Sequence, residues 1–106
     1  MSADSQEVAA IFFAATRALA SHTGSLQERL ADTYADHLLQ VVAHDLPPDL
    51  QPVFRELEAC MNSAAESDDD PFRAATQRLS DTEARAEIDR IVALFARLAG
   101  LRPPAS

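Results

Sequence analysis

Cysteine, lysine, tryptophan and glycine are rare or missing in this chain of 106 residues. Cys60 is the only cysteine, which excludes an intramolecular disulfide and a zinc site built from cysteine ligands. Gly24 and Gly100 are the only glycines. Without a glycine-rich stretch, the sequence has neither a phosphate-binding loop nor a dinucleotide-binding motif.

Basic residues are also scarce. All nine are arginine, against 17 acidic residues, and the formal net charge is −8 with a pI of about 4.6. This charge repels nucleic-acid phosphates and anionic lipid headgroups, so we expect no direct nucleic-acid partner and no membrane partner. The lack of lysine beside abundant alanine suggests a GC-rich coding sequence and a bacterial source.

Signals for export or membrane insertion are missing as well. The first ten residues, MSADSQEVAA, carry acids and no base, unlike the start of a secretory signal. No apolar run approaches the ~20 residues that span a bilayer. We therefore expect a cytoplasmic protein.

The apolar residues favour helix over sheet. They make up 47% of the chain, with 25% charged residues, which is a globular composition. Alanine and leucine outnumber valine and isoleucine, and alternating apolar and polar runs are missing, which disfavours strands. The length suits one domain over residues 1–106. The fold class we expect is all-α.

Apolar residues recur at steps of three and four along most of the chain, the spacing of one helix face. A short helix is expected before the last long one, and Asp4 or Ser5 can cap the first. Because the links between helices are short, we expect a small antiparallel bundle of four main helices, or an orthogonal variant of it. The long helices are predicted near residues 4–22, 25–44, 49–64 and 80–99.

Helix starts carry clear capping signals. Ser25 with Glu28, and Ser80 with Glu83, form S-x-x-E capping boxes, in which side chains satisfy the free N–H groups of the first turn. Asp70 stands before a proline, a favoured pair at a helix start. It ends the polar loop of residues 63–70.

The segment HDLPPDLQP, residues 44–52, predicts a connector between two helices. Pro47 and Pro48 cannot continue a helix, because they lack N–H groups and restrict the residues before them. Pro52 fits the first turn of the next helix. The cap should then be Asp49, accepting from the N–H of Gln51.

The two glycines are expected to end helices, and the helical stripes predict a core. Gly24 and Gly100 each follow a stripe, so we expect both in the left-handed conformation that closes a helix. The residues expected to be most buried are Leu30, Leu57, Ile91 and Phe95.

His37 is the most interesting titratable residue, because it lies between Leu30 and Val41 in an apolar arc. The simplest interpretation is a half-buried, hydrogen-bonded core residue. The alternative is a metal or small-ligand site, with an enzyme as one form of it. His44 is seven residues on, ~10 Å along a helix, too far to share one metal unaided. This alternative site comprises His37, Tyr34, His44 and His22.

Other sources of chemistry are weaker. Cys60 lacks a base and an electropositive setting, so it should behave as a small apolar residue. The acids of SDDDP are contiguous and lack the alternation of a calcium loop. No catalytic triad signature is present. We therefore expect a protein that is not an enzyme and holds no cofactor.

Phe13, Leu39 and Leu94 lie away from the centres of their apolar stripes and form a candidate interaction surface. The leading hypothesis is a non-enzymatic interaction or regulatory module that acts through helix surfaces. Its partner would be a protein, with a homodimer as one form. The acidic surface also suits a basic partner, or mimicry of nucleic acid toward a DNA-binding protein.

Overall fold

The computed structural model describes residues 5–63 and 70–100, and within these ranges every regular element is helical. The expected all-α class is confirmed. The elements are α1 (Ser5–Ser21), α2 (Leu26–Asp36), the 3₁₀ turns η1 (Leu38–Gln40) and η2 (Ala43–Asp45), α3 (Gln51–Met61), α4 (Pro71–Gln77) and α5 (Asp81–Leu98).

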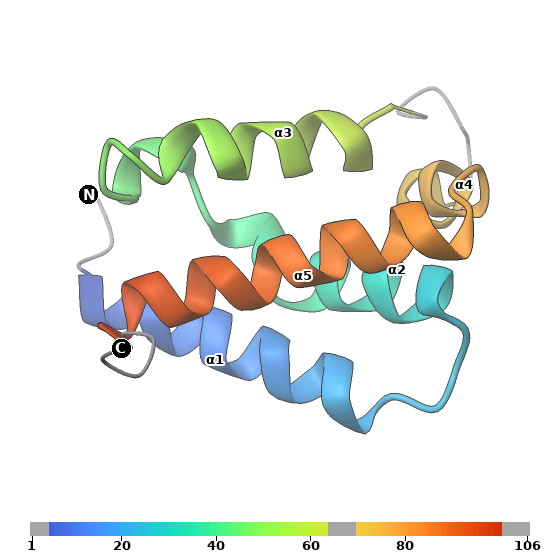
Figure 1. The fold of residues 1–106 in the computed structure, drawn as a ribbon, viewed down its shortest axis with the longest axis horizontal. Helices are drawn as coiled ribbons and strands as arrows, with labels where there is room; N and C mark the ends of the chain where they lie inside the picture. The colour runs from blue at the N-terminus through green and yellow to red at the C-terminus, as the bar shows by residue number, and fades with distance from the viewer. Residues whose placement is uncertain (1–4, 64–69, 101–106) are drawn as a thin grey trace, which may run out of the picture.

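Long helices pack along their lengths, and α4 lies across one end (Figure 1). α1 packs against α5 and α2, and α2 also packs against α4. α1 and α5 run in opposite directions, so the first half of α1 lies beside the second half of α5. This pairing brings the two ends of the chain's described part to the same side of the molecule.

The helix predicted over 25–44 is wrong in its second half. α2 ends at Asp36, and η1 and η2 follow it. Val41 and Val42 have extended backbone, with ψ near 135° at both. β-branched side chains favour that conformation, and burial of apolar side chains in the core stabilises it here. The irregular path buries Leu38, Val41, Ala43 and Leu46, a set that one straight helix would not bury together.

The capping predictions hold where the structure describes them. Ser25 Oγ accepts from the Glu28 N–H at 3.1 Å, and Glu28 accepts from the Ser25 N–H at 3.2 Å. The same reciprocal bonds join Ser80 and Glu83 at 3.1 and 2.9 Å. Asp70 accepts from the N–H three residues on at 3.0 Å. For the first helix, Asp4 lies outside the described residues.

Asp49 does not cap α3. The cap position is Leu50, whose side chain is buried and makes no capping bond. Asp49 instead pairs with Arg97 near the end of α5. Pro52 does lie in the first turn, as predicted. Burial of Leu50 in the core shifts the helix start by one residue and leaves the Asp49 carboxylate on the surface.

The two glycines end helices in different ways. Gly100 has a φ of 74° and is the only residue with positive φ in the described part of the chain, as predicted for a helix end. Gly24 does not have a positive φ, so its predicted left-handed conformation is wrong. Gly24 is needed for space: an added Cβ would lie 2.7 Å from Cε1 of His22.

The core lies between the long helices. Leu30, Leu57 and Ile91 are fully buried as predicted, whereas Phe95 is only partly buried. The rings of Phe12 and Phe54 meet edge to face in the centre, 6.0 Å apart. This core fixes the spacing of α1, α3 and α5, and so determines which side chains remain at the surface.

Candidate functional site

The histidines do not gather into one site. The ring of His37 is partly exposed at the end of α2 and makes no hydrogen bond to the residues that the structure describes. The ring of His44 is exposed, with Nε2 3.7 Å from the Asp45 carboxylate. Within residues 5–63 and 70–100, no group of three or more His, Cys, Asp or Glu side chains could hold a metal ion.

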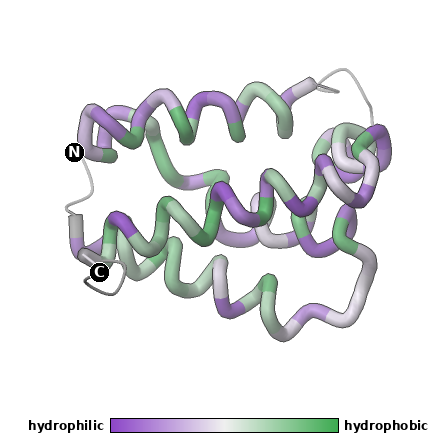
Figure 2. Tube along the Cα trace, viewed as in Figure 1, coloured by the Kyte–Doolittle hydropathy of each residue, from purple (hydrophilic) through white to green (hydrophobic). Residues whose placement is uncertain are grey.

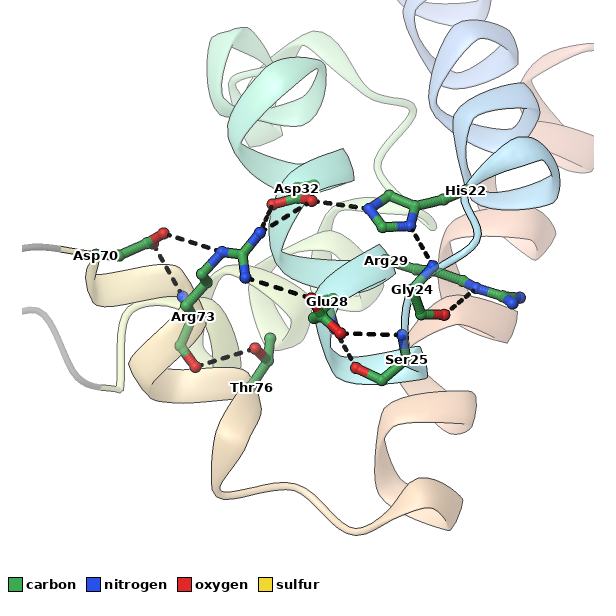
Figure 3. Close-up of polar contacts among 9 residues, drawn as sticks. All are labelled: His22, Gly24, Ser25, Glu28, Arg29, Asp32, Asp70, Arg73 and Thr76. Carbon is green, nitrogen blue, oxygen red and sulfur yellow. Dashed lines mark hydrogen bonds and ion pairs between the residues drawn. The ribbon is translucent and has the colours of Figure 1, made fainter.

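His22 is held by both ring nitrogens (Figure 3). Nδ1 accepts from the Gly24 N–H at 2.8 Å, and Nε2 lies 2.8 Å from Oδ2 of Asp32. Since Nδ1 accepts, the proton of the neutral ring is on Nε2, which donates to Asp32. Neither nitrogen is left for a ligand or for proton transfer to a substrate. His22 joins the end of α1 to α2.

Arg73 extends this cluster to α4 (Figure 3). Its guanidinium lies 3.0 Å from Asp32, 3.5 Å from Glu28 and 3.3 Å from Asp70. The hydrogen bond from His22, and then the charge of Arg73, hold the pKa of Asp32 below its usual value. A polar recess of about 330 Å³ lies beside the cluster, between α2 and α4. Because every acid here already faces a base or a backbone donor, the cluster fastens helices together.

Tyr34 belongs to the core. It is 2% exposed, and its ring meets that of Phe72 on α4 at 5.0 Å, edge to face. Burial, and then the nearby Glu58 carboxylate, raise the pKa of Tyr34 to about 12. The phenol is therefore neutral at ordinary pH and closed to solvent, unlike a group that meets a ligand.

A second polar cluster joins α3 and α5, and the sequence reasoning missed it. Glu87 is buried and accepts from Arg90 Nη1 at 2.5 and 2.8 Å, and Arg90 also pairs with Glu56 at 3.2 Å. Burial raises the pKa of Glu87, against the effect of Arg90. Burial and the Glu87 charge also raise the pKa of the Cys60 thiol, which disfavours a reactive thiolate.

Two of the three residues predicted to form an interaction surface are exposed. Phe13 is 53% exposed and Leu39 is 56% exposed. Leu94 is 1% exposed, so its predicted place on the surface is wrong. The buried stripe of α5 keeps Ala84 and Ile91 from the predicted face and adds Glu87 and Leu94, so it lies to one side of that face and leaves Val92 40% exposed.

Phe13 lies over an apolar groove between α1 and α5. Its ring is tilted against that of Phe95, with the centroids 5.7 Å apart. The groove has a volume of about 440 Å³ and is open along one side. Its lining residues are Gln6, Ala9, Ala10, Phe13, Phe95, Leu98 and Ala99, none of them charged.

The α1 side of the groove is poor in charge. α1 has one acidic and one basic residue among its 17, Glu7 and Arg17. Figure 2 accordingly shows the trace of α1 as apolar along most of its length, whereas hydrophilic residues are frequent in α3. In a chain with net charge −8, this groove is a neutral, apolar surface. The signal for it in the sequence was Phe13, a large apolar residue off the buried face of its helix.

Among the described helices, none combines the length and the apolar character needed to cross a membrane. Comparisons with protein-family models, with curated proteins and with solved structures found no match to this chain. The function must therefore be argued from the geometry of the side chains.

Proposed function

We propose that this protein is a non-enzymatic interaction module whose contact surface is the apolar groove between α1 and α5. The observation that carries the proposal is the position of Phe13, which is 53% exposed yet supported by Phe95. A large apolar side chain that is half exposed in an apolar groove is typical of a protein–protein contact surface.

The energetics favour a docking role for this groove. Both walls are helices, and the Phe13 ring is already held by its neighbour, so little conformational entropy is lost when a partner arrives. Burying an exposed aromatic side chain contributes about 1.5–3 kcal/mol at most. A tight complex therefore requires contacts over the whole groove and its alanine-rich rim.

The form of the complex follows from the same features. A homodimer is the first candidate, since a small helical bundle gains apolar burial by pairing. In the proposed antiparallel bundle, α1 and α5 would present the contact face. A basic protein could instead bind the acidic remainder of the surface. A DNA-binding protein could bind there too, with the acidic surface of this chain mimicking nucleic acid. We propose the bacterial cytoplasm as the setting.

The rival proposal, a metal or small-ligand site centred on His37, has less support. His22 is occupied at both nitrogens and Tyr34 is buried. A metal bound at His37 would raise the melting temperature of the intact protein but not of His37→Ala, by mass action. Thermal melts with and without zinc or nickel make this test.

Photo-crosslinking in the native host tests the leading proposal. A photoreactive phenylalanine analogue is introduced at position 13 in one variant and at position 39 in another. The two native side chains are almost equally exposed, but only Phe13 lines the groove. We expect protein adducts from position 13 and few from position 39. Equal yields at both positions, or no adduct at position 13, would contradict the proposal.

A further inference from the structure

We infer that the occupant of the groove is a second copy of this chain, paired about a twofold axis so that the two α1 helices run antiparallel. This inference rests on the proposed function and adds the identity and geometry of the partner. Among residues 6–21 of α1, five of the seven exposed side chains follow steps of four and three, which is the spacing of a helix–helix contact stripe. These five are Gln6, Ala10, Phe13, Arg17 and Ala20, and the other two, Glu7 and Ser21, lie to one side of the stripe.

The stripe is complementary to itself. Phe13 is the one large apolar side chain on it, and Ala9 and Ala10 lie one turn earlier in the same groove. A twofold axis that crosses α1 between Ala10 and Phe13 would bring the Phe13 ring of each copy against the alanines of the other. A large side chain over small ones is the arrangement that closely packed helices use.

Charge favours a second copy over a different partner. The groove lining has no charged residue, so a basic protein finds no acid there to pair with. Residues 91–98 of α5 carry one charge, Arg97, and α1 is neutral in sum. Two molecules of charge −8 repel each other less when they meet through a neutral face than through an acidic one.

The net charge of the two copies determines how salt affects the stability of the complex. Added salt screens the repulsion between two acidic copies, so it should strengthen the dimer. A complex with a basic protein would respond in the opposite way, because salt screens its attraction. The sign of the salt effect therefore separates the two kinds of partner.

Sedimentation equilibrium of the purified full chain tests the inference. We expect a monomer–dimer equilibrium whose dissociation constant falls as sodium chloride is added. Phe13→Asp should raise that constant more than about tenfold, equivalent to 1.4 kcal/mol. Leu39→Asp is the matched control, since Leu39 is equally exposed but does not line the groove, and it should leave the constant unchanged.

Three results would overturn the inference: a monomer at every concentration, equal weakening by both aspartate variants, or a dimer that salt weakens. Circular dichroism of both variants must match the parent, which is expected because both positions are exposed. If the chain is monomeric while position 13 crosslinks to another protein, the inference fails and the proposed function stands. If position 13 crosslinks to no protein, both fail.

Disulfide trapping tests the antiparallel geometry. In a Cys60→Ser background, Gln6→Cys and Arg17→Cys chains are mixed and oxidised. The proposed axis brings position 6 of one copy opposite position 17 of the other, whereas two copies of position 6 would be ~16 Å apart along the helices. A disulfide requires Cα atoms within about 7 Å. We expect mixed 6–17 dimers, and a predominance of 6–6 or 17–17 dimers would overturn the geometry.

Discussion

Gly24 donates its backbone N–H to Nδ1 of His22 at 2.8 Å, and it lies so close to the ring that a Cβ would be 2.7 Å from Cε1. The glycine at this link between α1 and α2 is thus a matter of space and not of backbone conformation. His22 can then turn its other nitrogen to Asp32 and fasten the two helices.

Gly24→Ala should therefore destabilise the protein by about 1–2 kcal/mol, the usual effect of overpacking. Alanine also restricts the unfolded chain, which stabilises the folded state by about 0.4–1 kcal/mol. This stabilisation is smaller than the destabilisation by overpacking. In a His22→Ala background the two closest contacts disappear and the nearest remaining approach is 3.3 Å, to Cβ of Glu28, so Gly24→Ala should become close to neutral. Urea denaturation of the four proteins measures this coupling, and additive effects would contradict the assigned contact.

The lowered pKa of Asp32 predicts a particular acid sensitivity. Because the folded-state pKa lies below the ordinary value of 3.8, its contribution to stability is present above that value and lost as the pH falls through the folded-state pKa. Asp32→Asn should be less stable at neutral pH and lose less stability on acidification. Unfolding midpoints of both proteins between neutral and acid pH provide the comparison, and parallel curves would rule out the role of Asp32.

Tyr34 is the only tyrosine, so the ultraviolet absorbance of the phenolate reports on it alone. Its pKa of about 12 predicts that the folded protein ionises two pH units later than a free phenol of pKa 10.0. Between those values only the unfolded state loses its proton, so stability should fall by up to about 1.4 kcal/mol per pH unit. Ionisation of the folded protein near pH 10 would show that Tyr34 is not buried.

Glu87 and Glu83 on α5 predict opposite outcomes of the same substitution. Burial raises the pKa of Glu87, so its charge is costly in the folded state, and Glu87→Gln should be neutral or stabilising by about 1 kcal/mol at pH 7. Glu83 accepts from the Ser80 N–H, and Glu83→Gln should weaken that cap and destabilise by about 0.5 kcal/mol. Urea denaturation of both variants measures the change in the free energy of unfolding. Clear destabilisation by Glu87→Gln would mean that its bonds to Arg90 outweigh the cost of burial.

The features predicted correctly from the sequence are those that depend on neighbouring residues. Both S-x-x-E boxes and the cap at Asp70 formed as expected, because a cap needs only a side chain and an N–H three residues apart. The exposure of Phe13 was also predictable, since its offset from the buried stripe of α1 is large.

The features that could not be predicted depend on tertiary packing. The early end of α2 depends on burying Leu38 and Leu46 together, which no local pattern reveals. In α5, apolar residues at adjacent positions allow two overlapping buried faces that share Ala84 and Ile91. The face that is buried also contains Glu87 and Leu94, and no local pattern favours a face with a carboxylate. The groove forms only where α1 and α5 lie side by side, and that pairing is a tertiary contact.

The central claim is that the surface around Phe13 is covered by another copy of the chain, and a tryptophan reporter tests it most directly. The chain has no tryptophan, so Phe13→Trp and Leu39→Trp each introduce a single indole at a half-exposed position. As protein concentration rises, the emission of the indole at position 13 should shift to the blue and become protected from iodide, while position 39 stays unchanged. Emission at position 13 that remains solvent-like and quenchable at every concentration would contradict the claim.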